Sequence, residues 1–343
     1  MIATKLDNHS SALASYLEKH IDGFRGPILL EEFDQGQSNP TFLLKAQSGK
    51  YVLRRKPPGE LLPSAHAVDR EYRVLTALAD TDVPVAHAFH LCEDESIIGS
   101  MFYVMSFEDG RIFWDPALPE LDRSQRSSIL EAQVRALASM HDIDVHAVGL
   151  GDFGSTANYY ERQISRWSRQ YRAAETETIP AMEKLMQWLP ENLPPDSGSI
   201  SLIHGDYRLD NLIFHPTEPR ILAVLDWELS TLGDPYADLA YLCMCMRLPE
   251  VGSLRGLDGK DPKALGLLTE QEMISLYCQL RGIDGIDHWS FYLAFSYFRV
   301  ASIVQGVYKR AQMGNASDPK AVSRANTAPT LAAMAAELIK KGA

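Results

Sequence analysis

The stretch His204-Gly-Asp-Tyr-Arg-Leu-Asp-Asn-Leu212 directly follows a short apolar run at residues 200–203. A second short apolar run, at residues 221–225, is followed at once by Asp226. Short apolar runs bounded by polar and turn-forming residues are typical of buried strands. We therefore expect carboxylate and amide side chains from both segments to gather where two strands end.

The spacing of these side chains fits phosphoryl transfer from ATP. That reaction needs a carboxylate that takes the proton of the attacking hydroxyl, and oxygen ligands for Mg²⁺ that bridges the phosphates. Asp206 and Asn211 are five residues apart, as are the catalytic Asp and the metal-binding Asn of kinases. We predict Asp206 as the catalytic base, with Asn211 and Asp226 as metal ligands. Asp210 is predicted either to bind substrate or to cap a turn.

The combination of His204-Gly-Asp206 with Asn211 and Asp226 resembles the aminoglycoside phosphotransferase and choline kinase superfamily, in which His-Gly-Asp replaces the His-Arg-Asp of protein kinases. The resemblance implies an α+β, bilobal protein-kinase-like fold and an ATP- and Mg²⁺-dependent small-molecule phosphotransferase. It also implies that His204 bonds loop backbone, and that Asp238 braces the loop from a helix. Because no Ala-Pro-Glu element follows Asp226, a protein kinase is disfavoured.

The pattern along the chain changes near residues 107–111. Residues 11–22 and 66–79 have helical apolar spacing. The remainder of the first part reads as short strands, at 29–33, 41–46, 51–54, 91–98 and 101–105. After the breaker Asp109-Gly110, helical spacing dominates. We predict a nucleotide-binding lobe at 1–107, with a five-stranded antiparallel sheet plus helix, and a mainly helical catalytic and acceptor-binding lobe at 108–343.

The resemblance extends to the first lobe with one departure. At the place of the kinase lysine that contacts the α- and β-phosphates, this chain has Arg54, as choline-kinase-like members do. The resemblance pairs Arg54 with Glu71 on the following helix, and arginine can form a bidentate bridge. Lys56 is the alternative phosphate contact, and Arg55 is otherwise expected at a solvated strand edge.

Further nucleotide contacts follow from the same resemblance. Ser38 lies in a loop that holds only one glycine, and it would bind the β-phosphate together with neighbouring amides. The run 101–110 resembles the hinge strand of kinases. There, backbone groups of Ser106 and Glu108 would bond the adenine edge, and Met105 would line the adenine pocket, which is compatible with a plain core position.

One predicted helix carries a cluster of arginines. Arg162, Arg166 and Arg169 fall at i, i+4 and i+7 and share one face, flanked by Trp167 and Tyr171. This face either binds an anion or is a solvated surface whose arginines pair with nearby glutamates. An anion-binding face would favour an acceptor such as a CoA ester and disfavour polycationic aminoglycosides.

The runs 51–59, 62–73 and 226–235 resemble one subfamily more closely. It is the kinase-like domain fused in some animals to acyl-CoA dehydrogenase-like domains, with free-standing bacterial relatives. The resemblance covers almost the whole chain and implies phosphorylation of 4-hydroxyacyl-CoA esters. Arg299 is then a buried structural cation or an acceptor contact. Two rivals stay open: a phosphotransferase for an antibiotic, choline or another small alcohol, and a nucleotide-binding module without catalysis.

Composition excludes several classes of protein. The 343 residues carry a formal net charge of −12, which argues against nucleic acid as a partner. No apolar run approaches the roughly 20 residues of a membrane span, and the first residues lack a basic segment followed by an apolar one. We therefore predict a cytoplasmic protein. The four cysteines read as buried thiols, and the oligomeric state and the choice between ATP and GTP stay open.

Overall fold

The structure is a computed structural model that describes residues 9–33, 39–57, 67–196, 198–250, 254–313 and 325–341. The chain forms two compact units. The first comprises Met1–Arg111 with Ile213–Leu229, and the second comprises Ile112–Leu212 with Ser230–Ala343. A single break between residues 107 and 108 would have placed Ile213–Leu229 in the second lobe, but this segment groups with the first unit.

Backbone hydrogen bonds explain why the segment Ile213–Leu229 belongs to the first unit. Phe214 and Arg111 exchange two of them, with N···O distances of 2.7 and 2.8 Å. The N–H of Val224 donates to the carbonyl of Pro84 at 2.8 Å. Such long-range backbone pairing leaves little trace in a sequence pattern, because any residue except proline can donate.

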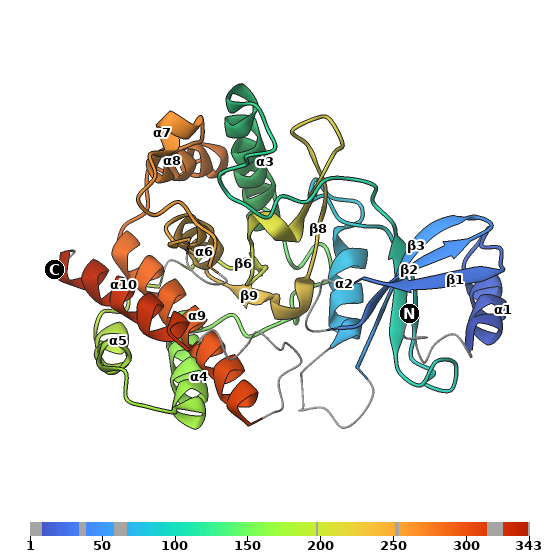
Figure 1. Ribbon diagram of the computed structural model, residues 1–343, viewed down its shortest axis with the longest axis horizontal. Helices are drawn as coiled ribbons and strands as arrows, with labels where there is room; N and C mark the ends of the chain where they lie inside the picture. Colours follow the sequence, from blue (N-terminus) through green and yellow to red (C-terminus); the bar gives the residue numbers. More distant parts are fainter. Residues whose placement is uncertain are drawn as a thin grey trace. The chain divides into compact units, whose positions relative to one another are not determined.

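The first unit is built on a five-stranded antiparallel sheet (Figure 1). Across the sheet the strands are β1 (Ile28–Glu32), β2 (Thr41–Ala46), β3 (Gly49–Arg55), β5 (Phe102–Ser106) and β4 (Ala88–Cys92). Two helices complete it, α1 (Ser10–His20) and α2 (Val68–Leu78). The predicted fold class, an antiparallel five-stranded sheet with a mainly helical second part, is confirmed.

The alternation of side chains along β3 separates two environments. Leu53 joins the apolar core that α1 shares with the sheet. Its neighbour Arg54 points to the other face, where α2 supplies the buried Glu71. The predicted strand at 91–98 is wrong beyond Cys92, because residues 95–98 form a turn from which Ile98 still packs into the core.

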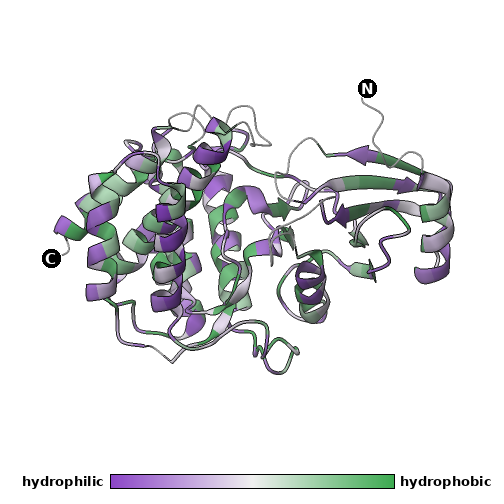
Figure 2. Cartoon of the chain, turned by 90° about the horizontal axis from the view of Figure 1, so that it is seen from below, coloured by the Kyte–Doolittle hydropathy of each residue, from purple (hydrophilic) through white to green (hydrophobic). Residues whose placement is uncertain are grey.

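The second unit is mainly helical. Its helices are α3 (Arg123–His141), α4 (Tyr159–Ala174), α5 (Pro180–Glu191), α6 (Tyr236–Met246), α7 (Pro262–Leu265), α8 (Glu270–Arg281), α9 (Trp289–Gln312) and α10 (Thr327–Lys341). Helix α9 packs against α4, α6 and α10 (Figure 1). Figure 2 shows hydrophilic and hydrophobic residues on the same helices, as expected where one face is buried. No helix in the described ranges combines the length and the apolar character needed to cross a membrane.

Four short strands lie before and after the polar stretch His204–Leu212 in the sequence. In the second unit β6 (Ser201–Ile203) pairs with β9 (Thr231–Gly233), and all three residues of β6 are buried. A hairpin-like pair, β7 (Leu212–Phe214) and β8 (Ile221–Val224), follows the stretch. Strands β7 and β9 were not predicted, since three residues are too few to show a period.

Candidate active site

The loop after β6 is held by one buried carboxylate. Asp238, on α6, has no solvent exposure and accepts hydrogen bonds from the backbone N–H groups of His204 (2.6 Å) and Gly205 (2.9 Å). Burial alone would raise the pKa of Asp238, but His141, His204 and these backbone donors lower it. Gly205 has a φ of +83°, which a residue without Cβ adopts most readily. This contact fixes the backbone just before Asp206.

Both carboxylate oxygens of Asp206 have hydrogen-bond donors. The hydroxyl of Tyr241 donates to Oδ1, and Nδ2 of Asn211 donates to Oδ2 at 3.0 Å and to the Asp206 carbonyl at 2.8 Å. Nε of Arg208 lies 3.9 Å from Oδ1. The Asp206 side chain is still 26% exposed, so its carboxylate is both oriented and accessible.

Sequence reasoning missed Tyr241. The residue lies three positions after Asp238, so the two share one face of α6, and both contact the loop. That spacing was the available signal. An apolar helical pattern such as Tyr241-Leu-Cys-Met-Cys-Met246 favours a plain core role, and only the structure shows the hydroxyl bonded to Asp206.

Two other loop residues have partners within the loop. Nδ1 of His204 accepts the backbone N–H of Asp206 at 3.1 Å. Asp210 forms an ion pair with Arg208. Burial raises the pKa of Asp210, while the Arg208 charge acts against this. The Asp210 carboxylate therefore neutralises the charge of Arg208 within the loop.

The oxygen donors of the loop suit a divalent cation. Both hydrogen bonds of the Asn211 side chain are donated by Nδ2, so they do not occupy its Oδ1. Amide and carboxylate oxygens are the ligands that Mg²⁺ takes, usually with several positions left to waters and phosphates. Across the described residues, no group of three or more His, Cys, Asp or Glu forms a complete protein cage. The donor set thus fits an ion held jointly with a nucleotide, in the way that kinases hold it.

In the first unit Arg54 lies among carboxylates. Its Nε is 2.8 Å from Glu71, its Nη2 donates to Asp226 at 2.6 Å, and Glu228 is 3.9 Å away. Burial opposes its charge, but Glu71 and Asp226 outweigh this and raise the pKa of the guanidinium. The expected bidentate bridge to Glu71 is not formed, because Nη2 is directed to Asp226 instead.

Glu71 is the most buried of the three carboxylates around Arg54. Only 1% of the residue is exposed, and it accepts hydrogen bonds from Nδ2 of Asn39 (2.6 Å) and the hydroxyl of Tyr103 (3.1 Å). Burial raises the pKa of Glu71, while the charge of Arg54 and these two donors act in the opposite direction. Arg54 is therefore held in place by a carboxylate that is itself fixed at both oxygens.

Asp226 has an uncommon backbone conformation. Its φ is +66°, in the left-handed region that costs a residue with a Cβ roughly 1–2 kcal/mol. The following Trp227 is buried, and its Nε1 donates to the carbonyl of Val224 at 3.0 Å, which anchors the turn. Backbone strain of this kind persists where the surroundings impose it, often at functional sites. Here it aims the Asp226 carboxylate at Arg54.

The neighbours of Arg54 differ in their surroundings. Arg55 is 8% exposed and its Nε donates to Oγ of Ser100 at 2.9 Å. The expectation of a solvated edge is therefore wrong for Arg55, because its side chain is buried and bonded to Ser100. Lys56 is half-buried and its backbone N–H donates to Met101. Of the candidates for the phosphate contact, Arg54 is the one paired with Glu71.

The predicted hinge residues lie at the end of β5. Met105 is 8% exposed and pairs with both neighbouring strands. The N–H of Ser106 donates to His87, so a nucleotide contact at Ser106 would have to use its carbonyl. The hydroxyl of Ser106 donates to the Glu108 carboxylate at 2.5 Å. The remaining nucleotide candidate, Ser38, lies outside the described residues.

The arginines of α4 are not neutralised by the glutamates around them. Arg162 donates to the carbonyl of Ser155 at 2.6 Å, and Arg169 donates to Oγ of Ser165 at 3.4 Å. Arg166 is exposed. Among the contacts of the described residues, none of the three forms an ion pair with a carboxylate. Their neighbour on the same helix, by contrast, does so: Arg172 pairs with Glu175 and Glu183.

The aromatic residues of α4 lie on its opposite, buried face. Trp167 and Tyr171 are 6% and 0% exposed, so the expectation that they flank the arginine face is wrong. Trp167 instead has the guanidinium of Arg166 at 5.2 Å and that of Arg299 at 5.8 Å from its ring. Arg299 is 6% exposed and donates to the carbonyl of Gly205, which supports its reading as a structural cation.

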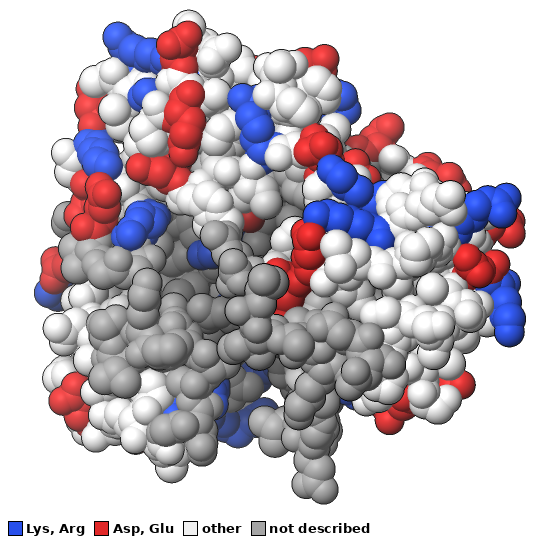
Figure 3. Space-filling view, turned by 45° about the vertical axis from the view of Figure 1, so that its right-hand side comes forward, with Lys and Arg blue, Asp and Glu red and all other residues white. Residues whose placement is uncertain are grey.

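Charged residues of both signs are interspersed on the face drawn in Figure 3. With a net charge of −12, the protein has no general positive field to attract an anion. Recognition of an anionic ligand must then depend on a local group of cations, and α4 provides one.

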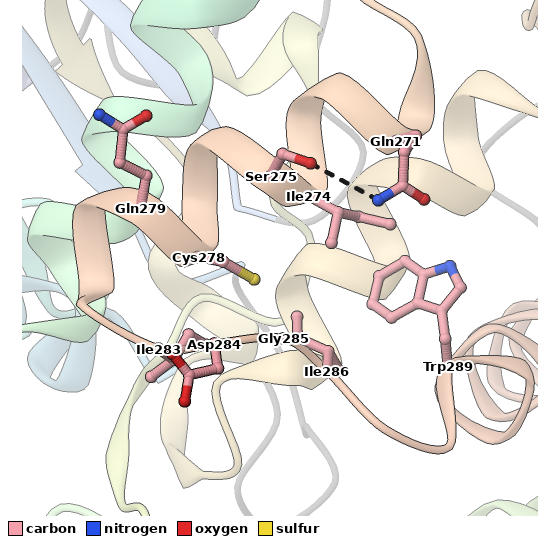
Figure 4. Close-up of a pocket in the computed structure, with 10 residues that line it drawn as sticks. All are labelled: Gln271, Ile274, Ser275, Cys278, Gln279, Ile283, Asp284, Gly285, Ile286 and Trp289. Carbon is pink, nitrogen blue, oxygen red and sulfur yellow. Dashed lines mark hydrogen bonds between the residues drawn. The ribbon is translucent and has the colours of Figure 1, made fainter.

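The second unit contains a cavity of about 360 Å³ (Figure 4). It is bordered by α8, the segment that follows it and Trp289. Its lining combines isoleucines with the polar side chains of Gln271, Ser275 and Gln279. None of the predicted site residues lines it, so we assign it no part in the reaction.

The buried His141 makes folding sensitive to acid. Its Nδ1 lies 2.7 Å from the hydroxyl of Tyr277 and its Nε2 lies 3.5 Å from Asp238. Burial lowers the pKa of His141, although Asp238 opposes this. The unfolded chain then binds the proton more readily, so the free energy of unfolding falls as the pH drops below about 6.5.

We expect His141→Gln to weaken this dependence, measured as the free energy of unfolding between about pH 7.5 and 5.5. His20→Gln replaces an exposed histidine and is the matched control. Equal slopes in all three proteins would contradict this role of His141.

Comparison with known proteins gives the family. The model of the phosphotransferase enzyme family matches residues 30–261. Acyl-CoA dehydrogenase family member 10 of Mus musculus is 49% identical over 331 residues, which cover 95% of this chain and 31% of that protein. Acyl-CoA dehydrogenase family member 11 of Homo sapiens is 43% identical over 337 residues, which cover 97% of this chain and 43% of that protein. The chain spans less than half the length of these curated relatives.

Comparison with solved structures points to the same family. A proposed aminoglycoside phosphotransferase from Ralstonia eutropha JMP134 has a TM-score of 0.88 and 49% identity, over 96% of this chain and 98% of that one. Choline kinase from Cryptosporidium parvum shares the fold at a TM-score of 0.61 and 13% identity, with 97% of each chain covered. The family model covers more than half of the chain, and the fold and the loop chemistry agree with it. The chain belongs to the phosphotransferase enzyme family and has the kinase-like fold.

Proposed function

We propose that the protein moves the γ-phosphate of ATP, with Mg²⁺, to the hydroxyl of a small anionic acceptor, and that the favoured acceptor is a hydroxyacyl-CoA. The observation that supports this most is the Asp206 carboxylate, held at both oxygens yet still 26% exposed. A general base needs a fixed direction and access to the proton that it takes.

Each residue has a defined part in the proposed reaction. The acceptor oxygen attacks the γ-phosphorus, the bond to the bridging oxygen of ADP breaks, and Asp206 takes the hydroxyl proton. Mg²⁺, held by Asn211 and Asp226, would neutralise charge on the phosphates. Arg54, steadied by Glu71, would contact the α- and β-phosphates.

Arg54 has to exchange partners when the nucleotide binds. It now donates to the Asp226 carboxylate at 2.6 Å, and the same carboxylate is proposed to hold the metal. A phosphate can replace Asp226 as the partner of Arg54 while the cation replaces Arg54 as the partner of Asp226. One contact between opposite charges is then lost and two are formed, which offsets the cost of breaking the Arg54–Asp226 pair. Met105, Ser106 and Glu108 remain the proposed adenine contacts.

Two observations support an anionic acceptor. The exposed Arg166 and its neighbour Arg169 form no ion pair with a carboxylate among the described residues, whereas Arg172 does. The relatives from Mus musculus and Homo sapiens are named as acyl-CoA dehydrogenase family members, and acyl-CoA esters carry several phosphate charges. Arg162 contributes less directly, because its guanidinium already bonds Ser155.

An aminoglycoside is the second candidate, since the Ralstonia eutropha relative of 49% identity is described as a proposed aminoglycoside phosphotransferase. Aminoglycosides are polycations, and unneutralised arginines would repel them. A coupled ADP-release assay with ATP and Mg²⁺ separates the acceptors. It compares 3- and 4-hydroxyacyl-CoA esters, kanamycin, choline and no acceptor, with Asp206→Asn as the inactive control.

We expect turnover on a hydroxyacyl-CoA that disappears in the control variant. Turnover on kanamycin or choline alone would overturn the CoA ester and leave the phosphotransferase reaction in place. ATP binding without turnover on any acceptor would instead favour the non-catalytic module.

Arg166→Ala tests the arginine face directly. Losing one charge-assisted contact to an anion costs about 1.5–3 kcal/mol, so the KM for the anionic acceptor should rise roughly 10- to 100-fold. The KM for ATP should be unchanged. Arg172→Ala, on the same helix but ion-paired with Glu183, is the matched control and should leave both constants near wild type. A rise of equal size in both variants would assign the effect to the helix and not to acceptor binding.

A further inference from the structure

The catalytic loop receives a side-chain contact that no kinase motif in the sequence accounts for. Tyr241 donates its hydroxyl proton to Oδ1 of Asp206, opposite the Asn211 bond to Oδ2. The residue is 7% exposed, so water competes little for this contact. Burial, with the negative charge of Asp206, raises the pKa of Tyr241 far above its ordinary value. The hydroxyl therefore keeps its proton and remains a donor.

The ring of Tyr241 is itself held. The guanidinium of Arg299, from α9, lies 5.7 Å from this ring and 5.8 Å from the ring of Trp167. Cations are attracted to the faces of aromatic rings at such distances, and arginine stacks best because its group is planar. Arg299 also donates to the carbonyl of Gly205, the residue before Asp206.

The charge of Arg299 is otherwise unexplained. The side chain is buried, and its contacts among the described residues are with aromatic rings and a backbone carbonyl and include no ion pair. A buried cation without a carboxylate partner is costly unless its other contacts are needed. Its contacts are the rings of Trp167 and Tyr241 and the carbonyl of Gly205, which connect Arg299 to α4, to α6 and to the loop of Asp206.

We propose that Tyr241 and Arg299 are positioning residues for phosphoryl transfer. Arg299 fixes the ring of Tyr241 and the carbonyl of Gly205, and the hydroxyl of Tyr241 then holds the Asp206 carboxylate in one orientation. This inference rests on the proposed function, because it takes Asp206 as the base. Displacement of a catalytic group by about 1 Å can cost roughly 100-fold in rate, which makes a positioning role consequential.

The decisive variant is Tyr241→Phe, which retains the ring against Arg299 and removes only the hydroxyl. We expect kcat to fall about 10- to 100-fold, while the KM for ATP stays within about twofold. The measurement includes the slow hydrolysis of ATP by water without any acceptor, so it does not depend on the correct acceptor. Tyr292→Phe, another buried tyrosine of the same unit, is the matched control and should leave kcat unchanged.

Arg299→Lys provides the second variant, since lysine keeps the charge but lacks the planar group. Its kcat should fall in the same way. The double variant Tyr241→Phe with Arg299→Lys should show a smaller fold-decrease in kcat than the product of the two single decreases, because both residues act through one carboxylate.

The outcomes separate the two proposals. An unchanged kcat in Tyr241→Phe, or a loss confined to KM, overturns the inference alone. A wild-type protein that turns over no ATP in either reaction overturns the proposed function, and the inference falls with it.

Discussion

Asp206→Asn lowers kcat for phosphoryl transfer by about 100- to 10,000-fold and leaves the KM for ATP close to that of the wild type. The amide cannot take the proton of the acceptor hydroxyl, yet it has nearly the same shape as the carboxylate. General acid–base catalysis typically contributes this range of rate. Since Asp206 is proposed to touch the acceptor and not the adenine or the ribose, nucleotide binding should persist.

Asp210→Asn is the matched control for this prediction. It removes a carboxylate from the same loop, and that carboxylate is ion-paired with Arg208. Its effect on kcat should be well below that of Asp206→Asn, and thermal unfolding of both variants checks that the loop is intact. Equal losses in the two variants would mean that loop structure, and not proton transfer, limits the rate.

The pairing of Asp206 with Asn211 could be predicted because both lie in one short segment of defined spacing. Asn211 indeed bonds the Asp206 carboxylate. The contact between Arg54 and Glu71 was also predicted, although the resemblance to the family supplied that pairing and not the local spacing. Local spacing carries information about contacts that form within one or two adjacent elements.

Contacts among distant elements left no such pattern. The burial of Arg55 depends on Ser100, and the stacking of Arg299 depends on α4 and α6, which lie far from it in the sequence. The amphipathic pattern of α4 was read from its arginines, so Trp167 and Tyr171 were assigned to the wrong face. The burial of Arg299 and the hydrogen bond from Tyr241 to Asp206 depend on which elements meet in three dimensions. A hydrophobicity pattern along the chain does not contain that information.

Glu71→Gln should destabilise the protein by about 1–3 kcal/mol, because Arg54 loses its most buried carboxylate partner and keeps Asp226 at 2.6 Å. Arg54 would keep its charge in a site where its side chain is only 13% exposed. The new amide would also bring N–H donors toward Asn39 and Tyr103, which already donate to this position. Glu31→Gln is the control, because the pair of Glu31 with Lys45 is exposed and should contribute no more than about 1 kcal/mol.

The double variant Arg54→Met with Glu71→Leu separates stability from function. Replacing both members of a buried ion pair by apolar residues is often neutral or stabilising, so denaturant unfolding should show most of the lost stability restored. Phosphoryl transfer should nevertheless remain low, because no cation is left on β3 at this position to contact the phosphates. If activity returned together with stability, Arg54 would be a structural residue and Lys56 would become the phosphate contact. If stability stayed low, the core around Asn39 and Tyr103 would depend on the polar group itself and not on charge balance.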